Sequence, residues 1–512
     1  MVIEPGNLTL DQLQRIHQGN EPLLLSDGCR AGIRASADVV RAAADGDAPV
    51  YGVNTGFGKL ANQRISKSDL AVLQLNLIRS HSVGVGEPLS PPIMRLMLAL
   101  KAASLARGYS GVREEVVDTI LAVVNAGLVP WVPARGSVGA SGDLAPLAHM
   151  TLALLGEGSM LQDGKAVPAL AALQRAGITP LTLGPKEGLA LINGTQTSTA
   201  LALHGLLAFE PVLESALVIG ALTVDAARGS DGPFDPRIHD LRGQPGQIDV
   251  ARYYRSLLSG SEIRLSHLDG DDRVQDPYSL RCQPQVVGAC LDSLRHAALV
   301  LVREANAVTD NPLVFAQDGA MVSGGNFHAE PVALAADAMA LAIAEVGAIA
   351  ERRIAMLIDS GVSRLPPFLT SDAGLNSGFM IAHVTAAALA SENKSLAHPA
   401  SVDSLPTSAN QEDHVSMATF AARRLQDMIT NTAHILGIEW LAAAQAIEFL
   451  RPLRSSPALE QAHALLREQV PPLAQDRYLA PDIAHAHALV RDGALSPILR
   501  SLPGLPVLWV AV

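Results

Sequence analysis

The chain has 512 residues, of which 48% are apolar but only 4% aromatic, and Ala, Leu and Val supply most of the apolar share. Ala and Leu are good helix formers, so this composition predicts a mainly α protein with a sizeable buried core. Lys and Arg number 38 against 50 Asp and Glu, which gives a net charge of −12. Basic and aromatic residues form no stripe that would neutralise phosphates, so we expect no nucleic acid partner.

The three cysteines, Cys29, Cys282 and Cys290, are odd in number and too few to staple a chain of this length. They indicate a reducing compartment, and we expect a cytoplasmic protein. The first ten residues lack the basic and apolar segments of a secretory signal, and Thr9-Leu-Asp-Gln12 predicts a capping box instead. The longest apolar stretches are interrupted by charged residues, so we expect no membrane span.

Up to about residue 193, short helical patterns alternate with loops rich in Gly and Pro. From about residue 195 the pattern changes to long helices rich in Ala and Leu, expected at 201–227, 284–307, 329–359, 378–395 and 415–449. Helices of this length predict a bundle. We therefore divide the chain into an N-terminal region of mixed helices and loops at 1–194, a central long-helix bundle at 195–450, and a C-terminal helical segment at 451–512 that packs on the bundle.

Small residues occur on many faces of the predicted long helices, together with more apolar surface than one subunit can easily bury. Close helix packing between subunits would bury this surface. We expect a homo-oligomer.

The sequence does not match the motifs of several common cofactor and metal sites. The glycine-rich stretch at residues 51–60 is one residue too long for a phosphate-binding loop, and Leu60 stands where that loop requires a hydroxyl. No lysine lies in a convincing context for a pyridoxal phosphate Schiff base; the lysines are at 59, 67, 101, 165, 186 and 394. His485 and His487 are two residues apart and share no helix face, so we expect no metal site.

The most informative segment is Gly136-Ser-Val-Gly-Ala-Ser-Gly-Asp-Leu-Ala-Pro-Leu-Ala-His149. Its three glycines allow tight, left-handed backbone, and we expect Asp143 to cap the following helix, so that the loop is folded sharply yet held. In such a loop the amide nitrogen of Gly142 is pressed against the carbonyl carbon of Ala140, and ring closure gives an imidazolone. Loss of the carbonyl oxygen and of the Ser141 hydroxyl as water then leaves an exocyclic methylidene, which is an electrophile. The alternative is an ordinary flexible loop.

This segment and five further blocks resemble the aromatic amino acid ammonia-lyases and aminomutases, which carry a methylidene-imidazolone (MIO) prosthetic group. The resemblance covers nearly the whole chain and implies a fumarase/aspartase-like fold, with MIO made from Ala140, Ser141 and Gly142 and no external cofactor. We also expect a homotetramer whose subunits share active sites, because the pocket blocks are widely spaced and the long Ala-rich helices need neighbours to cover them. The further blocks are at residues 51–58, 191–195, 275–283, 324–328 and 408–414.

The resemblance assigns a role to each pocket residue. Tyr51 is implied as the base at the substrate β-carbon, although a phenol with a reference pKa of about 10 serves at neutral pH only if its anion is stabilised. Arg281 is implied to bind the substrate carboxylate, for which a guanidinium offers two parallel donors. Asn193 is implied to polarise the MIO carbonyl or assist its formation. The other implied pocket residues are Gln275, Tyr278 and Phe327, with Tyr278 among the catalytic ones.

Without the resemblance, four of these residues can also be interpreted as purely structural. Tyr51 would then pack a glycine loop, Arg281 would form a structural ion pair, Asn193 would cap a helix, and Phe327 would belong to the core. Pro277 also leaves open whether Gln275, Tyr278 and Arg281 share a helical face.

Substrate choice depends on fewer positions. The pair His81-Ser82 resembles the histidine-directed members of the family, and Glu412 occupies a position where tyrosine- and phenylalanine-directed members usually lack a carboxylate. A buried imidazole needs an acceptor for its N–H, which Glu412 or its neighbour Asp413 would supply. The implied reaction is elimination of ammonia from L-histidine to give trans-urocanate, the first step of histidine degradation. The alternatives are a tyrosine or phenylalanine ammonia-lyase, an aminomutase, or a non-catalytic helical scaffold.

Overall fold

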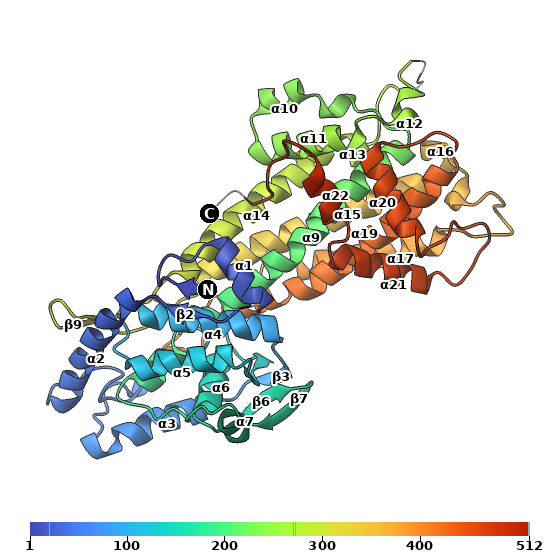
Figure 1. Cartoon of the computed structure of the whole chain (residues 1–512). Helices are drawn as coiled ribbons and strands as arrows, with labels where there is room; N and C mark the ends of the chain where they lie inside the picture. Colours follow the sequence, from blue (N-terminus) through green and yellow to red (C-terminus); the bar gives the residue numbers. More distant parts are fainter. Residues whose placement is uncertain (20, 270, 272, 510–512) are drawn as a thin grey trace.

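The computed structural model describes residues 1–19, 21–269, 271 and 273–509, and it is mainly helical, as the composition predicts. The molecule is elongated (Figure 1), with the N-terminal region at one end and long helices that run from it to the other end. A single large hydrophobic cluster extends from Ile3 to Leu508, so residues from all three predicted segments contribute to one core.

The α-helices described in the N-terminal region are α1 (Leu10–Gln18), α2 (Arg30–Asp45), α3 (Leu70–His81), α4 (Pro91–Ala106), α5 (Glu114–Asn125), α6 (Leu144–Leu154), α7 (Ala169–Arg175) and α8 (Glu187–Ile192). The predicted capping box opens α1. Thr9 Oγ1 accepts from the Gln12 backbone at 3.2 Å, and Gln12 Oε1 accepts from the Thr9 backbone at 3.0 Å.

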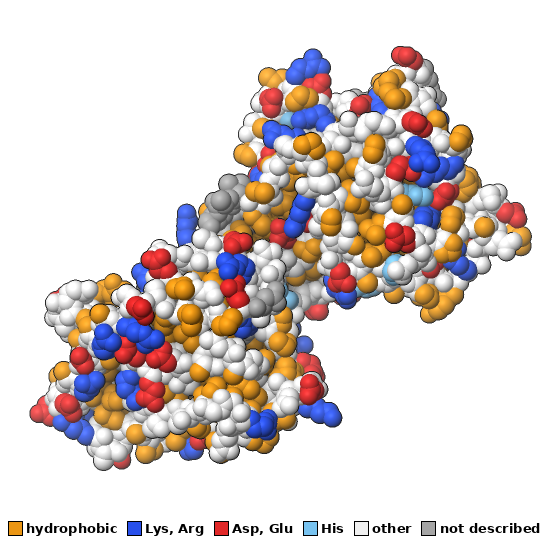
Figure 2. Space-filling model, viewed as in Figure 1, with side chains coloured by type: hydrophobic (Ala, Val, Ile, Leu, Met, Phe, Trp, Pro, Cys, Tyr) orange, Lys and Arg blue, Asp and Glu red, His pale blue; other side chains and the backbone are white. Residues whose placement is uncertain are grey.

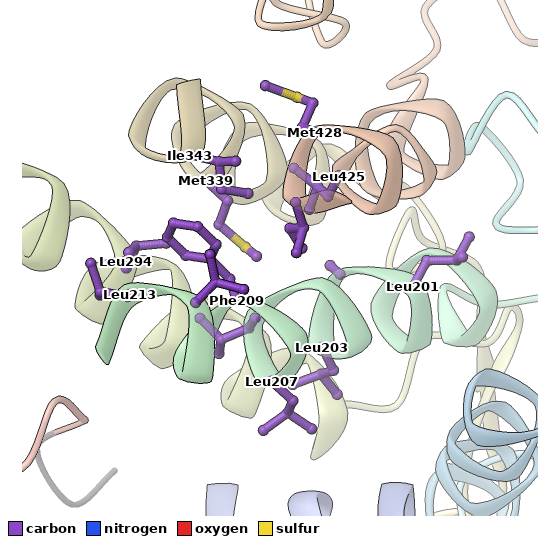
Figure 3. Packing of buried hydrophobic residues seen from close by; sticks show 14 of the residues in the cluster. Leu201, Leu203, Leu207, Phe209, Leu213, Leu294, Met339, Ile343, Leu425 and Met428 are labelled. Atoms are coloured by element: carbon purple, nitrogen blue, oxygen red, sulfur yellow. The ribbon is translucent and has the colours of Figure 1, made fainter. Parts of the chain in front are cut away.

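The long helices are α9 (Gln196–Ala226), α14 (Gln283–Ala305), α15 (Glu330–Ile358), α17 (Met380–Leu396) and α19 (Leu425–Glu448). α15 packs against α14, α17, α19 and α9, which makes it central to the bundle. Figure 3 shows Phe209 and Leu213 of α9 beside Leu294 of α14 and Met339 of α15. The shorter helices of this part are α10 (Pro236–Arg242), α11 (Pro245–Leu258), α12 (Glu262–Leu265), α13 (Tyr278–Arg281), α16 (Ser360–Ser363), α18 (Ala418–Arg423), α20 (Pro457–Arg467), α21 (Ala480–Arg491) and α22 (Ser496–Ser501).

The helix predicted at 415–449 begins later than predicted and is divided into two helices. The pattern at 415–449 predicts one helix, but the structure has α18 and α19 with a break at Arg424. Residues 415–417 are not helical because the Met417 amide donates to the Val138 carbonyl at 2.8 Å and Met417 adopts a φ of 56°. The tertiary contact with residue 138 therefore overrides the local helical pattern.

The described strands are short: β1 (Val2–Ile3), β2 (Leu24–Leu25), β3 (Val85–Pro88), β4 (Val129–Pro130), β5 (Pro133–Arg135), β6 (Ser159–Gln162), β7 (Lys165–Pro168), β8 (Leu313–Phe315) and β9 (Ala320–Val322). β1 pairs with β2 in parallel, while β4–β6–β7 and β8–β9 are antiparallel. The pair that matters for the site is β3–β5, antiparallel with Val85 opposite Arg135 and Pro88 opposite Pro133. It joins the end of α3 to the start of the loop at 136–143.

Within the described part of the chain, three helices, α9, α14 and α15, are long and apolar enough to cross a membrane by length and composition. In the structure the apolar windows of α9, α14 and α15 are 83%, 50% and 67% buried inside the molecule. α15 and α19 are also joined by a buried ion pair, in which Arg353 Nε lies 2.5 Å from Glu439 Oε1. The apolar faces of α9 and α15 are thus largely covered by other helices of the same chain.

Apolar side chains also reach the surface along the body, among interspersed acidic and basic ones (Figure 2). On α15, Leu334 and Leu341 are more than half exposed, and on α17 the same holds for Ile381 and Val384. These exposed rows lie on two of the long bundle helices.

Candidate active site

The loop between β5 and α6 carries the tripeptide Ala140-Ser141-Gly142, and its glycines are sterically required. Gly139 and Gly142 have φ values of 64° and 75°, in the left-handed region. A Cβ on Gly142 would lie 2.3 Å from the Gly194 carbonyl oxygen, and one on Gly139 would lie 2.3 Å from Ser416 Oγ. The loop is therefore compressed between two other segments of the chain, as the sequence predicts.

Asp143 holds this loop, but not in the way the sequence predicts. It occupies the N-cap position of α6 without a side-chain capping bond. Its carboxylate is fully buried and accepts instead from the Ser198 amide at 2.7 Å, in the first turn of α9, and from the hydroxyls of Ser198, Ser137 and Thr419. The prediction of a cap on the following helix is wrong because Asp143 caps a helix that is distant in sequence.

Asn193 lies opposite the tripeptide, at the C-terminal end of α8. Its Nδ2 donates to the Ser141 carbonyl oxygen at 2.7 Å. The next residue, Gly194, forms a parallel bridge with Gly142, and its carbonyl accepts from the Asp143 amide at 2.7 Å. Asn193 Oδ1 is buried with no hydrogen-bond partner among the described residues. Asn193 also occupies the C-cap of α8, so its capping role and its contact with Ser141 coexist.

Glu412 approaches the tripeptide from the other side of the cavity. The Ser141 hydroxyl donates to its Oε1, while Oε2 accepts from Thr407 Oγ1 at 2.5 Å and from Ser408 Oγ at 2.9 Å. Burial acts to raise the pKa of Glu412, but these hydroxyl donors more than offset it and hold the pKa below its ordinary value. The carboxylate is therefore ionised at neutral pH and available as an acceptor.

His81 ends α3 and lines the same cavity. Its Nδ1 lies 2.8 Å from the Leu77 carbonyl oxygen. Burial lowers the pKa of His81, with the Leu77 carbonyl and the charge of Glu412 opposing that shift. Ser82 follows directly, but its hydroxyl donates to the Ile78 carbonyl of α3 at 2.9 Å.

The tripeptide and its neighbours line a cavity of about 1300 Å³. Tyr51 and Phe327 both line it, with Ala140, Ser141, Asn193 and Glu412. The Tyr51 hydroxyl accepts from the Gly58 amide at 3.4 Å, and its ring lies edge-on to Phe57 with centroids 6.4 Å apart. The structure thus brings together most of the predicted pocket residues, which come from separated parts of the chain.

Three predicted pocket residues lie elsewhere in the chain's own fold. Gln275 is exposed, Tyr278 is 71% exposed, and Arg281 stacks over the Tyr278 ring at 4.6 Å while its Nε donates to the Asp276 carbonyl at 3.0 Å. Tyr278 and Arg281 form the short helix α13, which begins just after Pro277, so Gln275 is outside the helix. In Figure 1, α13 lies at the opposite end of the bundle from α6.

Comparisons with known proteins identify the family of this chain. The family model described as aromatic amino acid lyase matches residues 8–468. The chain belongs to the aromatic amino acid lyase family. It is 62% identical over 494 residues to a histidine ammonia-lyase of Aromatoleum aromaticum, covering 96% of this chain and 94% of that protein.

Solved structures of family members share the fold over the whole length. The crystal structure of histidine ammonia-lyase from Trypanosoma cruzi has a TM-score of 0.90 at 43% identity, covering 99% of this chain and 98% of that one. The structure of a tyrosine aminomutase from Streptomyces globisporus has a TM-score of 0.92 at 35% identity, covering 99% and 100%. The mainly α lyase fold is therefore confirmed.

Two histidines of the site were not predicted from the sequence. His328 and His414 line the cavity with nearly parallel rings, their centroids 5.8 Å apart and their planes 9° apart. Each histidine is the last residue of a sequence block that carries the family resemblance. That location could have indicated that the two histidines belong to the site. Among the described residues, no group of three or more His, Cys, Asp or Glu side chains is arranged to hold a metal ion.

Proposed function

We propose that this protein eliminates ammonia from L-histidine to give trans-urocanate, using an MIO group that it makes from Ala140, Ser141 and Gly142. The observation that carries the proposal is the contact of Glu412 with Ser141. It provides an ionised carboxylate, suited to an imidazole N–H, at the residue that would become the electrophile. The 62% identity to a histidine ammonia-lyase supports the same substrate.

The residues around the tripeptide fit such a group. The glycines allow the compression that cyclisation needs, and Asn193 Nδ2 already donates to the carbonyl that the ring would retain. Once formed, MIO supplies an electrophilic carbon for the substrate amine, which makes ammonia a better leaving group. The unpartnered Asn193 Oδ1 is a further polar atom beside that position.

The protein's side chains then bind, orient and deprotonate the substrate. Tyr51 accepts the proton from the β-carbon. Glu412 accepts a hydrogen bond from the imidazole N–H, and Phe327 and His81 flank the ring. Arg281 binds the carboxylate through two parallel donors, with Gln275 and Tyr278 beside it. Ser82 supports this pocket through its bond to α3.

Arg281, Tyr278 and Gln275 would reach the site from a neighbouring subunit. We propose a homotetramer with shared active sites, because α13, which carries Tyr278 and Arg281, lies at the opposite end of the bundle from α6, and because α15 and α17 expose apolar rows. In this arrangement residues 1–194 carry the reactive loop, 195–450 form the bundle that meets other subunits, and 451–512 pack on it. The three unpaired cysteines suit a reducing cytoplasm.

A product assay tests the proposal. The purified protein is incubated separately with L-histidine, L-tyrosine and L-phenylalanine, and released ammonia and the conjugated acid are measured. We expect ammonia and trans-urocanate from histidine, with far lower turnover of the other two. Equal or greater turnover of tyrosine, or a β-amino acid as the main product, would instead identify a tyrosine-directed lyase or an aminomutase.

A further inference from the structure

Lys101 is a buried lysine that contacts the backbone of the candidate site. It lies on α4 with 1% of its surface exposed. Its Nζ donates to the carbonyl oxygens of Asn193 at 2.8 Å and Ala190 at 3.1 Å, and it forms no ion pair with any described residue. Burying an ammonium without a carboxylate partner is costly, so its retention needs a reason.

The charges around Lys101 are mixed. Burial lowers its pKa to about 7, the carboxylates of Asp310 and Asp143 oppose that shift, and Lys186 adds to it. The cost of the buried charge is thus only partly offset by these neighbours.

The two carbonyls bound by Lys101 end α8 and lead into the segment that faces the tripeptide. The Asn193 side chain donates to the Ser141 carbonyl, and Gly194 bridges Gly142. Lys101 therefore holds the backbone of the residue whose amide contacts Ser141. No described contact joins Lys101 to Ser141 itself, so any effect on the site passes through Asn193.

Resting on the function proposed above, we propose that Lys101 is a positioning residue that fixes the Asn193 backbone so that its amide stays aimed at the Ser141 carbonyl. In the MIO group that carbonyl would be conjugated with the electrophilic carbon, and the Asn193 amide would stabilise negative charge on its oxygen. A donor held in place before the reaction stabilises such charge without reorganising. The same alignment keeps the Ser141–Gly142 segment against Gly194 while the ring closes.

A positioning role and a purely structural role predict different results for Lys101→Met. Met has nearly the same length and removes the cost of a buried amine but leaves the Asn193 and Ala190 carbonyls without this donor, so the two effects oppose and the thermal midpoint should change by only a few degrees. We expect kcat for L-histidine, or the fraction of chains that have lost two waters, to fall about 10- to 100-fold, because bonds to a charged donor are lost. KM should change by less than about threefold, since Lys101 touches no substrate.

The matched control is Ser104→Ala. Ser104 lies on the same helix, is buried, and donates to the Ala307 carbonyl at 3.0 Å, away from the tripeptide. The Ser104→Ala variant should lose a little stability but keep the wild-type kcat and the same dehydrated fraction as wild type. A second test places Lys101→Met in an Asn193→Ala background. If Lys101 acts through Asn193, it should there cost less than about threefold in kcat or in dehydrated fraction.

The inference is overturned if Lys101→Met keeps both kcat and dehydrated fraction within about twofold of wild type, or if its full effect persists in the Asn193→Ala background. A purely structural role would instead give a large fall in the thermal midpoint of Lys101→Met together with its activity. If Lys101→Arg then recovers the thermal midpoint but not kcat, the inference is also overturned. If the wild-type chain loses two waters but is inactive on histidine, only the proposed substrate is contradicted. The role of Lys101 can then still be tested by comparing the fraction of dehydrated chains in wild type and Lys101→Met.

Discussion

Replacing Glu412 by Gln tests the basis of substrate choice. The Glu412 carboxylate accepts hydroxyl donors from Ser141, Thr407 and Ser408, which keep it ionised. Gln has the same shape, and its amide can donate to Thr407 and Ser408, whose hydroxyls can turn to accept. The variant should therefore fold with a loss of about 1 kcal/mol or less.

The loss in activity should be larger and specific to histidine. A hydrogen bond between a charged carboxylate and the imidazole N–H is worth about 1.5 to 3 kcal/mol, which corresponds to roughly one to two powers of ten in kcat/KM. Glu412→Ala should lose more, since it leaves a buried N–H donor unpaired. Tyrosine has no imidazole N–H, so its slow turnover should stay unchanged or rise.

The assay measures kcat/KM for histidine and tyrosine in parallel, together with the intact mass of each variant. The mass is needed because Glu412 touches Ser141, so a failure to dehydrate would lower activity on every substrate. Asp413→Asn is the matched control, since this neighbouring carboxylate also lines the cavity. Equal losses on both substrates in fully dehydrated Glu412→Gln, or a histidine-specific loss in Asp413→Asn instead, would refute the assignment.

Three further outcomes follow from the structure. Mixing inactive Tyr51→Phe with inactive Arg281→Ala chains under conditions of subunit exchange should restore activity, and no recovery in verified mixed oligomers would contradict shared sites. Asp143→Asn should lower the dehydrated fraction and cost about 2 kcal/mol or more of stability, since the buried carboxylate accepts four hydrogen bonds; wild-type mass and unfolding free energy would contradict this. Burial and the nearby His17 lower the pKa of His204 to about 4. Because the unfolded chain binds this proton at about pH 6.5, the free energy of unfolding should be unaffected by His204 above that pH and should fall by up to about 3 kcal/mol as the pH drops to about 4. His204→Gln should flatten this dependence in unfolding measurements, and an unchanged pH profile would contradict it.

Much of the fold could be predicted from the sequence because its signals are local. Helical periodicity and small apolar residues predict the long helices, and the observed α9, α14, α15 and α17 overlap the expected ranges closely. The boundary at Met417 could not be predicted, because it depends on a hydrogen bond to Val138 that no local pattern reveals.

The site was predictable only in part for the same reason. The glycine spacing predicts the compressed loop, but the true partner of Asp143, at Ser198, lies 55 residues away. Lys101 has no motif at all, since its role depends on carbonyls that only the folded chain places beside it. Arg281 and Tyr278 are predicted in the same pocket as Ser141, but the chain holds them on α13, at the opposite end of the bundle from α6, and no local pattern reveals that separation.

The intact mass of the purified wild-type chain, beside that of Ser141→Ala, tests the central claim most directly. Cyclisation of Ala140, Ser141 and Gly142 with two dehydrations should leave the wild-type chain lighter than its sequence by two water molecules. Ser141→Ala should retain at least the water derived from the serine hydroxyl and lose activity on histidine. An active wild-type preparation with the full, unmodified mass would contradict the account.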